Sequence, residues 1–156
     1  MKKLLLLAFL VPCLTLSAQS NQEEIEMYQA IFGMEKKEIS SQLITLTEEN
    51  KETFWSIYDQ YETERKAIGQ NRIALLTKYA EMYADIDEEN VTPLVKESMA
   101  IRADADKLVK TYYNKIYKEV GHVPAAQFYQ LEHYFMSEIN VAIYSNVPMV
   151  GELKVD

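Results

Sequence analysis

The residues best suited to chemistry are the two histidines of the chain, His122 and His133, with Glu132 and Glu138 near the second of them. Imidazoles and carboxylates are metal ligands, and di-iron helical bundles place a glutamate three residues before a histidine. Gln130 stands at that position before His133. The sequence therefore predicts no metal site, and we expect His122 to close the helix that precedes it.

The acidic stretch from Asp85 to Asn90 superficially resembles a calcium-binding loop. However, Asn90 stands where such a loop needs glycine, and Lys96 stands where it needs a bidentate glutamate. A solvated acidic turn is the better interpretation. The sequence also shows no glycine-flanked serine, no phosphate-binding loop and no cysteine besides Cys13. We therefore expect a protein without enzyme activity and without a cofactor.

The first 18 residues have the pattern of a secretory signal peptide. Two lysines precede an apolar run of about 13 residues, and a pair of small residues ending at Ala18 follows it. Because a helix needs roughly 20 apolar residues to span a bilayer, we expect cleavage near Ala18 rather than a retained anchor. Lipidation at Cys13 is the alternative, but the residues before Cys13 are not the small ones that it needs. The mature protein is then expected in the periplasm or secreted.

Cleavage would change what the composition implies. It would leave 138 of the 156 residues, which suits one domain, and it would remove the only cysteine, so that no disulfide could form. It would also leave 14 basic against 24 acidic residues. An acidic surface repels phosphate backbones and anionic lipids. We therefore expect protein partners, neither nucleic acid nor membrane insertion, and a fold held together by packing.

Apolar residues recur every three or four positions, and glycine and proline are rare, so the sequence predicts an all-α fold. Three long antiparallel helices are expected, as a bundle or an open bent hairpin, with one or two short N-terminal helices. The first runs from Thr47 to about Ala84 without a break at Gly69, the second ends at Gly121, and the third runs from Pro124 to just before Pro148.

The expected organisation has four parts: the signal peptide (1–18), short helices or an arm (19–46), the helical domain (47–150) and a tail (151–156). Residues 22–32 predict a short helix, with Gly33 placed for a left-handed cap. Residues 36–45 are compatible with a second short helix or with an extended arm.

A five-residue pattern recurs near three expected helix starts, and it reads apolar residue, cap, two others, then amide. Its three copies are Leu46, Thr47 and Asn50; Ile86, Asp87 and Asn90; and Val123, Pro124 and Gln127. The cap and the amide can form a variant of the capping box, which satisfies free backbone N–H groups.

The second copy leaves two alternatives open because of Pro93. If Asp87 caps the helix, Pro93 lies inside it and removes one backbone hydrogen bond, and Ile86 and Val91 are placed for a hydrophobic staple. Otherwise the helix starts at Thr92, with Pro93 at its first position.

The repeated pattern resembles the Leu-Thr-x-x-Gln motif of the Spy/CpxP family of bacterial periplasmic proteins. Residues 54–61 (Phe-Trp-x-Ile-Tyr-x-x-Tyr), 128–132 and 147–150 look like segments of small exported relatives without established function, over most of residues 40–150. The resemblance implies a bent helical hairpin that forms dimers and acts as an ATP-independent chaperone or a periplasmic stress sensor. Asn50 and Pro124 depart from the family's glutamine and threonine, and the acidic charge departs from the basic cradle of the chaperone members.

We therefore expect a non-enzymatic binding protein for partly unfolded protein clients. The alternatives are a regulatory or interaction subunit for one envelope protein partner and a structural helical protein of unknown role. An acidic cradle would favour basic clients. The candidate binding or dimer surface consists of Phe54, Trp55, Tyr58 and Tyr61. Packing in the core or a dimer interface is the simpler interpretation of these residues, and Trp55 is the one best suited to an exposed patch.

Overall fold

The computed structural model of the protein describes residues 32–150, and all regular secondary structure in that range is helical. The all-α fold expected from the sequence is thus confirmed. No helix of the described part is long and apolar enough to cross a bilayer. The expected signal peptide (1–18), nearly all of the short helix expected over residues 22–32, and the tail (151–156) lie outside the described residues.

The chain divides into two units, residues 1–37 and 38–156. In the first unit, residues 32–37 are described and are helical, and Gly33 lies within this helix. The expected left-handed cap at Gly33 was therefore wrong, because the residues after it are good helix formers that carry the helix on. In the second unit, residues 38–43 are helical. The alternative of an extended arm over residues 36–45 is thus not observed.

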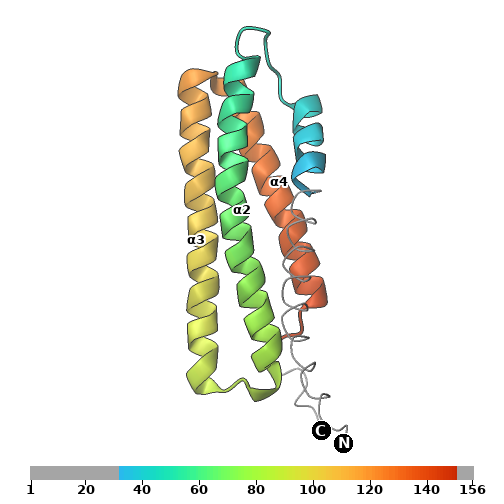
Figure 1. Ribbon diagram of the computed structural model, residues 1–156, viewed down its shortest axis with the longest axis vertical. Coiled ribbons are helices and arrows are strands. Elements are labelled where there is room, and N and C mark those ends of the chain that lie inside the picture. Colours follow the sequence, from blue (N-terminus) through green and yellow to red (C-terminus); the bar gives the residue numbers. More distant parts are fainter. Residues whose placement is uncertain (1–31, 151–156) are drawn as a thin grey trace, which may run out of the picture. The chain divides into compact units, whose positions relative to one another are not determined.

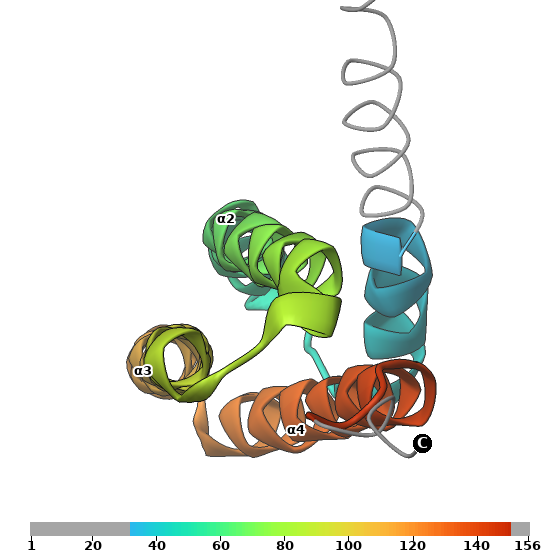
Figure 2. The same ribbon diagram turned by 90° about the horizontal axis from the view of Figure 1, so that it is seen from below.

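The second unit contains three long helices: α2 (Lys51–Met82), α3 (Glu88–Glu119) and α4 (His122–Asn146), with a short 3-10 helix η1 (Tyr83–Asp85) after α2. α2 packs against α3, and α3 packs against α4. Figure 1 shows α2 and α3 side by side, and Figures 1 and 2 both show α4 tilted relative to them. α2 is continuous through Gly69, as expected.

The start of α3 confirms the capping box of the second motif copy. The Asp87 carboxylate accepts hydrogen bonds from the backbone N–H groups of Glu89 (3.0 Å) and Asn90 (2.9 Å), and the Asn90 side-chain oxygen accepts one from the Asp87 N–H (3.0 Å). α3 therefore begins at Glu88 and contains Pro93. The alternative start at Thr92 was wrong, because these bonds already satisfy free N–H groups at the first turn.

The first motif copy forms the same reciprocal pair one turn before α2. The Thr47 N–H donates to the Asn50 side-chain oxygen (2.8 Å), and the Asn50 N–H donates to the Thr47 hydroxyl (3.4 Å). The backbone N–H of Lys51 also donates to the Thr47 carbonyl (3.1 Å). Thr47 and Asn50 thus close a turn over residues 48–50, and α2 begins after it at Lys51. The expected helix start at Thr47 was therefore early, because the reciprocal pair caps this turn and not the helix itself.

The third motif copy does not cap a helix. α3 ends before Gly121, whose φ of 136° lies in the region that favours glycine, and α4 begins at the next residue, His122. Pro124 is therefore the third residue of α4, where its missing N–H costs no helical hydrogen bond. The expected helix start at Pro124 was two residues late, because the backbone turn at Gly121 sets the boundary. The expectation that His122 closes α3 was wrong for the same reason, because His122 opens α4.

Two hydrophobic clusters hold the second unit together. Cluster one joins all three helices and contains Ile44, Phe54, Ile57, Tyr58, Tyr61, Leu108, Val109, Tyr112, Ile116, Ala125 and Phe128. Cluster two lies where α2 ends and α3 begins, and contains Leu75, Ile86, Leu94 and Ile101. Val91 packs against the same cluster as Ile86, as the predicted hydrophobic staple requires.

Candidate interaction surface

The aromatic residues near the start of α2 form core rather than surface. Phe54, Tyr58 and Tyr61 are buried in cluster one, and Trp55 is half-buried against it. Phe128 of α4 meets the rings of Tyr58 and Tyr61 edge to face, with centroids 6.5 and 5.0 Å apart. These three α2 residues therefore cannot form the exposed binding surface considered above, because α4 covers their face of α2.

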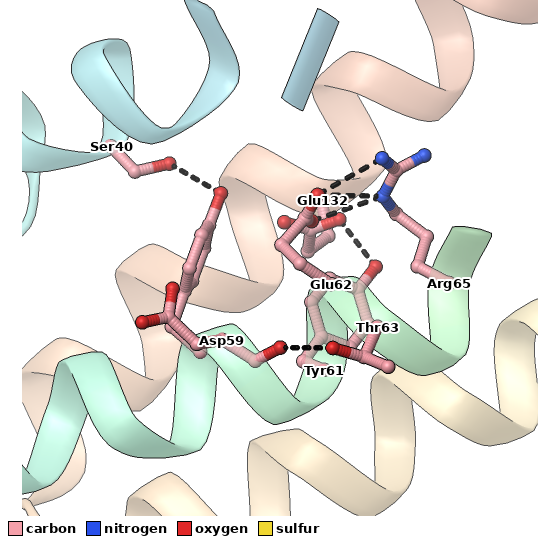
Figure 3. A network of polar contacts seen from close by, with 8 residues as sticks. Ser40, Asp59, Tyr61, Glu62, Thr63, Arg65 and Glu132 are labelled. Carbon is pink, nitrogen blue, oxygen red and sulfur yellow. Dashed lines mark hydrogen bonds and ion pairs between the residues drawn. The ribbon is translucent and has the colours of Figure 1, made fainter. Parts of the chain in front are cut away.

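A buried hydrogen bond joins α2 to α4 inside this core. The Tyr61 hydroxyl donates to a carboxylate oxygen of Glu132 over 2.5 Å, and both side chains are almost fully buried (Figure 3). Burial and the nearby Glu132 carboxylate raise the pKa of Tyr61 far above its ordinary value. The hydroxyl therefore remains a neutral donor, which suits a fixed structural contact between the two helices.

Two further polar contacts surround this bond. The Tyr58 hydroxyl shares a hydrogen bond with that of Ser40 (3.4 Å), and burial raises the pKa of Tyr58. On the next turn of α2, Arg65 donates to both carboxylate oxygens of Glu62 at 2.9 to 3.1 Å (Figure 3). Burial alone would lower the pKa of Arg65, but the Glu62 ion pair raises it above its ordinary value. Arg65 therefore stays charged within a mostly buried pair.

The amides of the first and third motif copies each bond a residue near the other copy, at one end of the three helices. Gln127 accepts a hydrogen bond from the Thr45 N–H (2.8 Å) and donates one to the Thr45 hydroxyl (3.1 Å). The Asn50 amide donates to the carbonyl of Val120 at the end of α3 (3.4 Å). These amides therefore connect the segment before α2 to the α3–α4 turn, in addition to the capping contacts of Asn50.

The two histidines belong to a strip of neighbouring rings. His122 stacks on Tyr117 of α3 with centroids 4.3 Å apart, and His133 lies 4.3 Å from Tyr129 on α4. Tyr113 joins these pairs, at 6.1 Å from Tyr117 and 5.9 Å from Tyr129. No group of three potential metal ligands occurs within residues 32–150. The histidines thus contribute aromatic surface, and Glu132 near His133 in sequence is buried against Tyr61.

The same side of the α3–α4 pair continues toward the far end of both helices. Arg102 of α3 donates to the hydroxyl of Tyr144 of α4 (2.8 Å), and Tyr144 is 69% exposed. Met99 and Val95 lie three and seven residues before Arg102, so they share its side of α3, and both are exposed. Helical spacing places Tyr144 on the side of α4 that carries Tyr129 and His133.

We call this surface the α3–α4 face. Each member either contacts another member or shares its side of a helix by spacing. The members are Val95, Met99, Arg102, Tyr113, Tyr117, His122, Tyr129, His133 and Tyr144. Exposed tyrosines and methionines offer apolar area with adaptable contacts, which suits binding of other chains.

We compared the chain with known proteins. No protein-family model, curated protein or solved structure matches it. The interpretation of its function therefore rests on its own sequence and geometry.

The α3–α4 face was not predicted as a surface from the sequence. The two histidines were considered only as possible metal ligands, and no surface was expected on their side of α3 and α4. The spacing of Tyr113 and Tyr117, and of Tyr129 and His133, places each pair on one helix side. Only the alignment of α3 against α4 brings these pairs together, and one sequence alone does not fix that alignment.

Proposed function

We propose that this protein is an exported, non-enzymatic binding protein that holds partly unfolded chains reversibly, without ATP, on its α3–α4 face. The observation that carries the proposal is the exposure of tyrosine, methionine and valine side chains along that face. Burying apolar area contributes roughly 25 cal/mol per Å², so several such side chains can bind a client without a shaped pocket.

The charge of the chain and the family resemblance support the same proposal. The full chain has a formal net charge of −8, which favours clients with basic segments and speeds their encounter. The resemblance to Spy/CpxP proteins, carried by the motifs at Leu46 and Ile86, implies chaperone or stress-sensor activity outside the cytoplasm. Dimerisation stays a prediction from the same resemblance, which analytical ultracentrifugation can test.

Aggregation assays test the proposal directly. We expect the purified protein, at modest molar excess, to suppress aggregation of several unrelated proteins as they unfold. A variant with Tyr117→Ser, Tyr129→Ser and Tyr144→Ser should lose most of this activity, because it removes three exposed rings of the face. Its helical circular dichroism should remain.

A matched control uses an exposed tyrosine of α4 that points elsewhere. Tyr134 is exposed, and helical spacing places it roughly 100° from its neighbour His133 on the α3–α4 face. Tyr134→Ser should leave suppression intact. Equal losses in the control and in the face variant would contradict the proposed surface, and no suppression by the parent protein would contradict the proposed function.

A dedicated partner is the second candidate function, in which the protein regulates one envelope sensor. The ordered ring strip from His122 to His133 favours it, because rings fixed against one another suit a partner of one shape better than many clients. A pull-down from an envelope extract that yields one dominant partner, together with no suppression of aggregation, would support regulation over chaperone activity.

A further inference from the structure

Two tyrosines at the end of α2 hold the segment that follows α4. Tyr79, near the end of α2, donates its hydroxyl to the carbonyl of Pro148 (2.7 Å), and Tyr83 of η1 donates to the carbonyl of Met149 (2.6 Å). The tyrosines are four residues apart, and their ring centroids are 5.5 Å apart. We call this pair the tyrosine clasp.

The clasp holds the segment by its main chain. The side chains of Met149 and Val150 are exposed, at 79% and 54%, while the carbonyls of Pro148 and Met149 accept the tyrosine hydrogen bonds. Backbone carbonyls are present in every residue of every protein. A pair of donors directed at neighbouring carbonyls can therefore bind a chain without regard to its side chains.

The clasp itself is held firmly in position. Both tyrosine rings pack against cluster two, together with Met82, so their hydroxyls are presented from a packed surface. Such fixed donors need little reordering when a new segment replaces the present one.

We propose that the tyrosine clasp is a main-chain binding site for unfolded protein segments, and that residues 147–150 occupy it as a tethered competitor. This inference rests on the proposed function, and it names what a client contacts besides the α3–α4 face. A short tether gives an effective concentration of about millimolar. A client that also binds the α3–α4 face can therefore displace the segment, whereas a short free peptide needs millimolar concentration.

A fluorophore on the segment tests the proposal in the full chain. Val150→Cys, with Cys13→Ser, provides one labelling site, and fluorescence anisotropy reports how freely the label rotates. Tyr79→Phe with Tyr83→Phe should increase rotation, because the segment loses both hydrogen bonds. Tyr134→Phe, at an exposed tyrosine of α4 outside the α3–α4 face, should not. Unchanged rotation in the Tyr79 and Tyr83 variant would overturn the clasp.

Two ligands then test what the clasp binds. A synthetic peptide of residues 147–156, at millimolar concentration, and a permanently unfolded protein, such as reduced and carboxymethylated α-lactalbumin, should each increase label rotation in the parent chain. Neither should increase it further in the Tyr79 and Tyr83 variant. A label at Ser145→Cys, in the last turn of α4, should report no change and thus show that α4 stays folded.

The outcomes separate this inference from the proposed function. If the unfolded protein binds, measured independently by cosedimentation, while the Val150 label does not change, the clasp is not a client site and the proposed function stands. If the peptide frees the label but the unfolded protein does not bind, the main-chain site stands and the proposed function fails.

Discussion

The two ends of the three-helix unit differ in how they are packed. At the end that contains the α3–α4 turn, cluster one draws on all three helices, and Phe54, Tyr58, Ile116, Ala125 and Phe128 are fully buried. At the other end, cluster two draws on α2, α3 and their connection, and each of its members keeps 5 to 8% of its surface exposed. Cluster one therefore has a fully buried centre, whereas cluster two is a smaller core without one.

The polar contacts differ in the same way. At the cluster-one end, α4 is fixed by the buried bond between Tyr61 and Glu132. At the cluster-two end, α4 and its following segment are held by exposed contacts from Arg102, Tyr79 and Tyr83. Exposed hydrogen bonds compete with water and are easily broken and remade. The cluster-two end is therefore the end at which α4 and its following segment can separate at the lower cost.

The largest expected effect is that of emptying cluster one. Phe128→Ala removes a fully buried ring that meets Tyr58 and Tyr61, so we expect a loss of about 4 kcal/mol in the free energy of unfolding. Leu75→Ala, a truncation in cluster two, should cost about 2 kcal/mol, because leucine is smaller than phenylalanine and Leu75 keeps 8% of its surface exposed. Urea unfolding monitored by circular dichroism measures both, and equal losses would contradict the unequal packing.

The buried bond between α2 and α4 should give the next effect. Tyr61→Phe removes the donor to the Glu132 carboxylate, so we expect a loss of about 2 kcal/mol. A double-mutant cycle with Glu132→Gln isolates the coupling between the two side chains. A coupling energy near zero would show that this bond does not hold α4 in place.

Alkaline pH should weaken the cluster-one end through Tyr112. Burial and its hydrogen bond to Glu64 (2.6 Å) raise the pKa of Tyr112 from 10.0 to about 12. Below pH 10 the tyrosine is protonated in both the folded and the unfolded chain, and its contribution to stability is complete. Between pH 10 and 12 the unfolded chain loses the proton first, so stability falls. Tyr112→Phe should make the fall shallower, and an unchanged slope in urea unfolding against pH would contradict this origin.

The smallest expected effect concerns the cap of α3 at the cluster-two end. Asp87→Ala removes two hydrogen bonds to backbone N–H groups, so we expect a loss of about 1 kcal/mol. Glu88→Ala, a neighbouring acidic residue whose side chain does not form the cap, controls for the loss of charge. If the two variants lose the same stability, electrostatics at the helix start and not the cap is responsible.

The sequence pattern predicted the helices well, because helix formation and helix ends depend on residues close together in the chain. Apolar spacing gave the three long helices, Gly121 marked the end of α3, and Asp87 with Asn90 formed the predicted capping box. The role of Gln127 at a helix start was predicted wrongly, because its contact is not local. Its amide matches the motif, but it bonds Thr45, 82 residues away, and that contact depends on how the helices pack.

The candidate surface was harder to predict than the fold. The residues of the α3–α4 face have the same types and spacing as core residues, and only the register of α3 against α4 shows which side stays exposed. The clasp was also missed: Tyr79 and Tyr83 lie in an apolar stripe, and their hydroxyls reach carbonyls nearly 70 residues later.

Hydrogen exchange along the full chain tests the contrast between the two ends most directly. We predict that amides in α2 from Phe54 to Tyr61, and in α3 from Leu108 to Ile116, exchange only by global unfolding. Amides from Leu75 to Ile101 should exchange through a smaller opening, with a lower free energy. If both regions exchange with the same free energy, the two ends form one cooperative core, and the lower stability assigned to the cluster-two end is wrong.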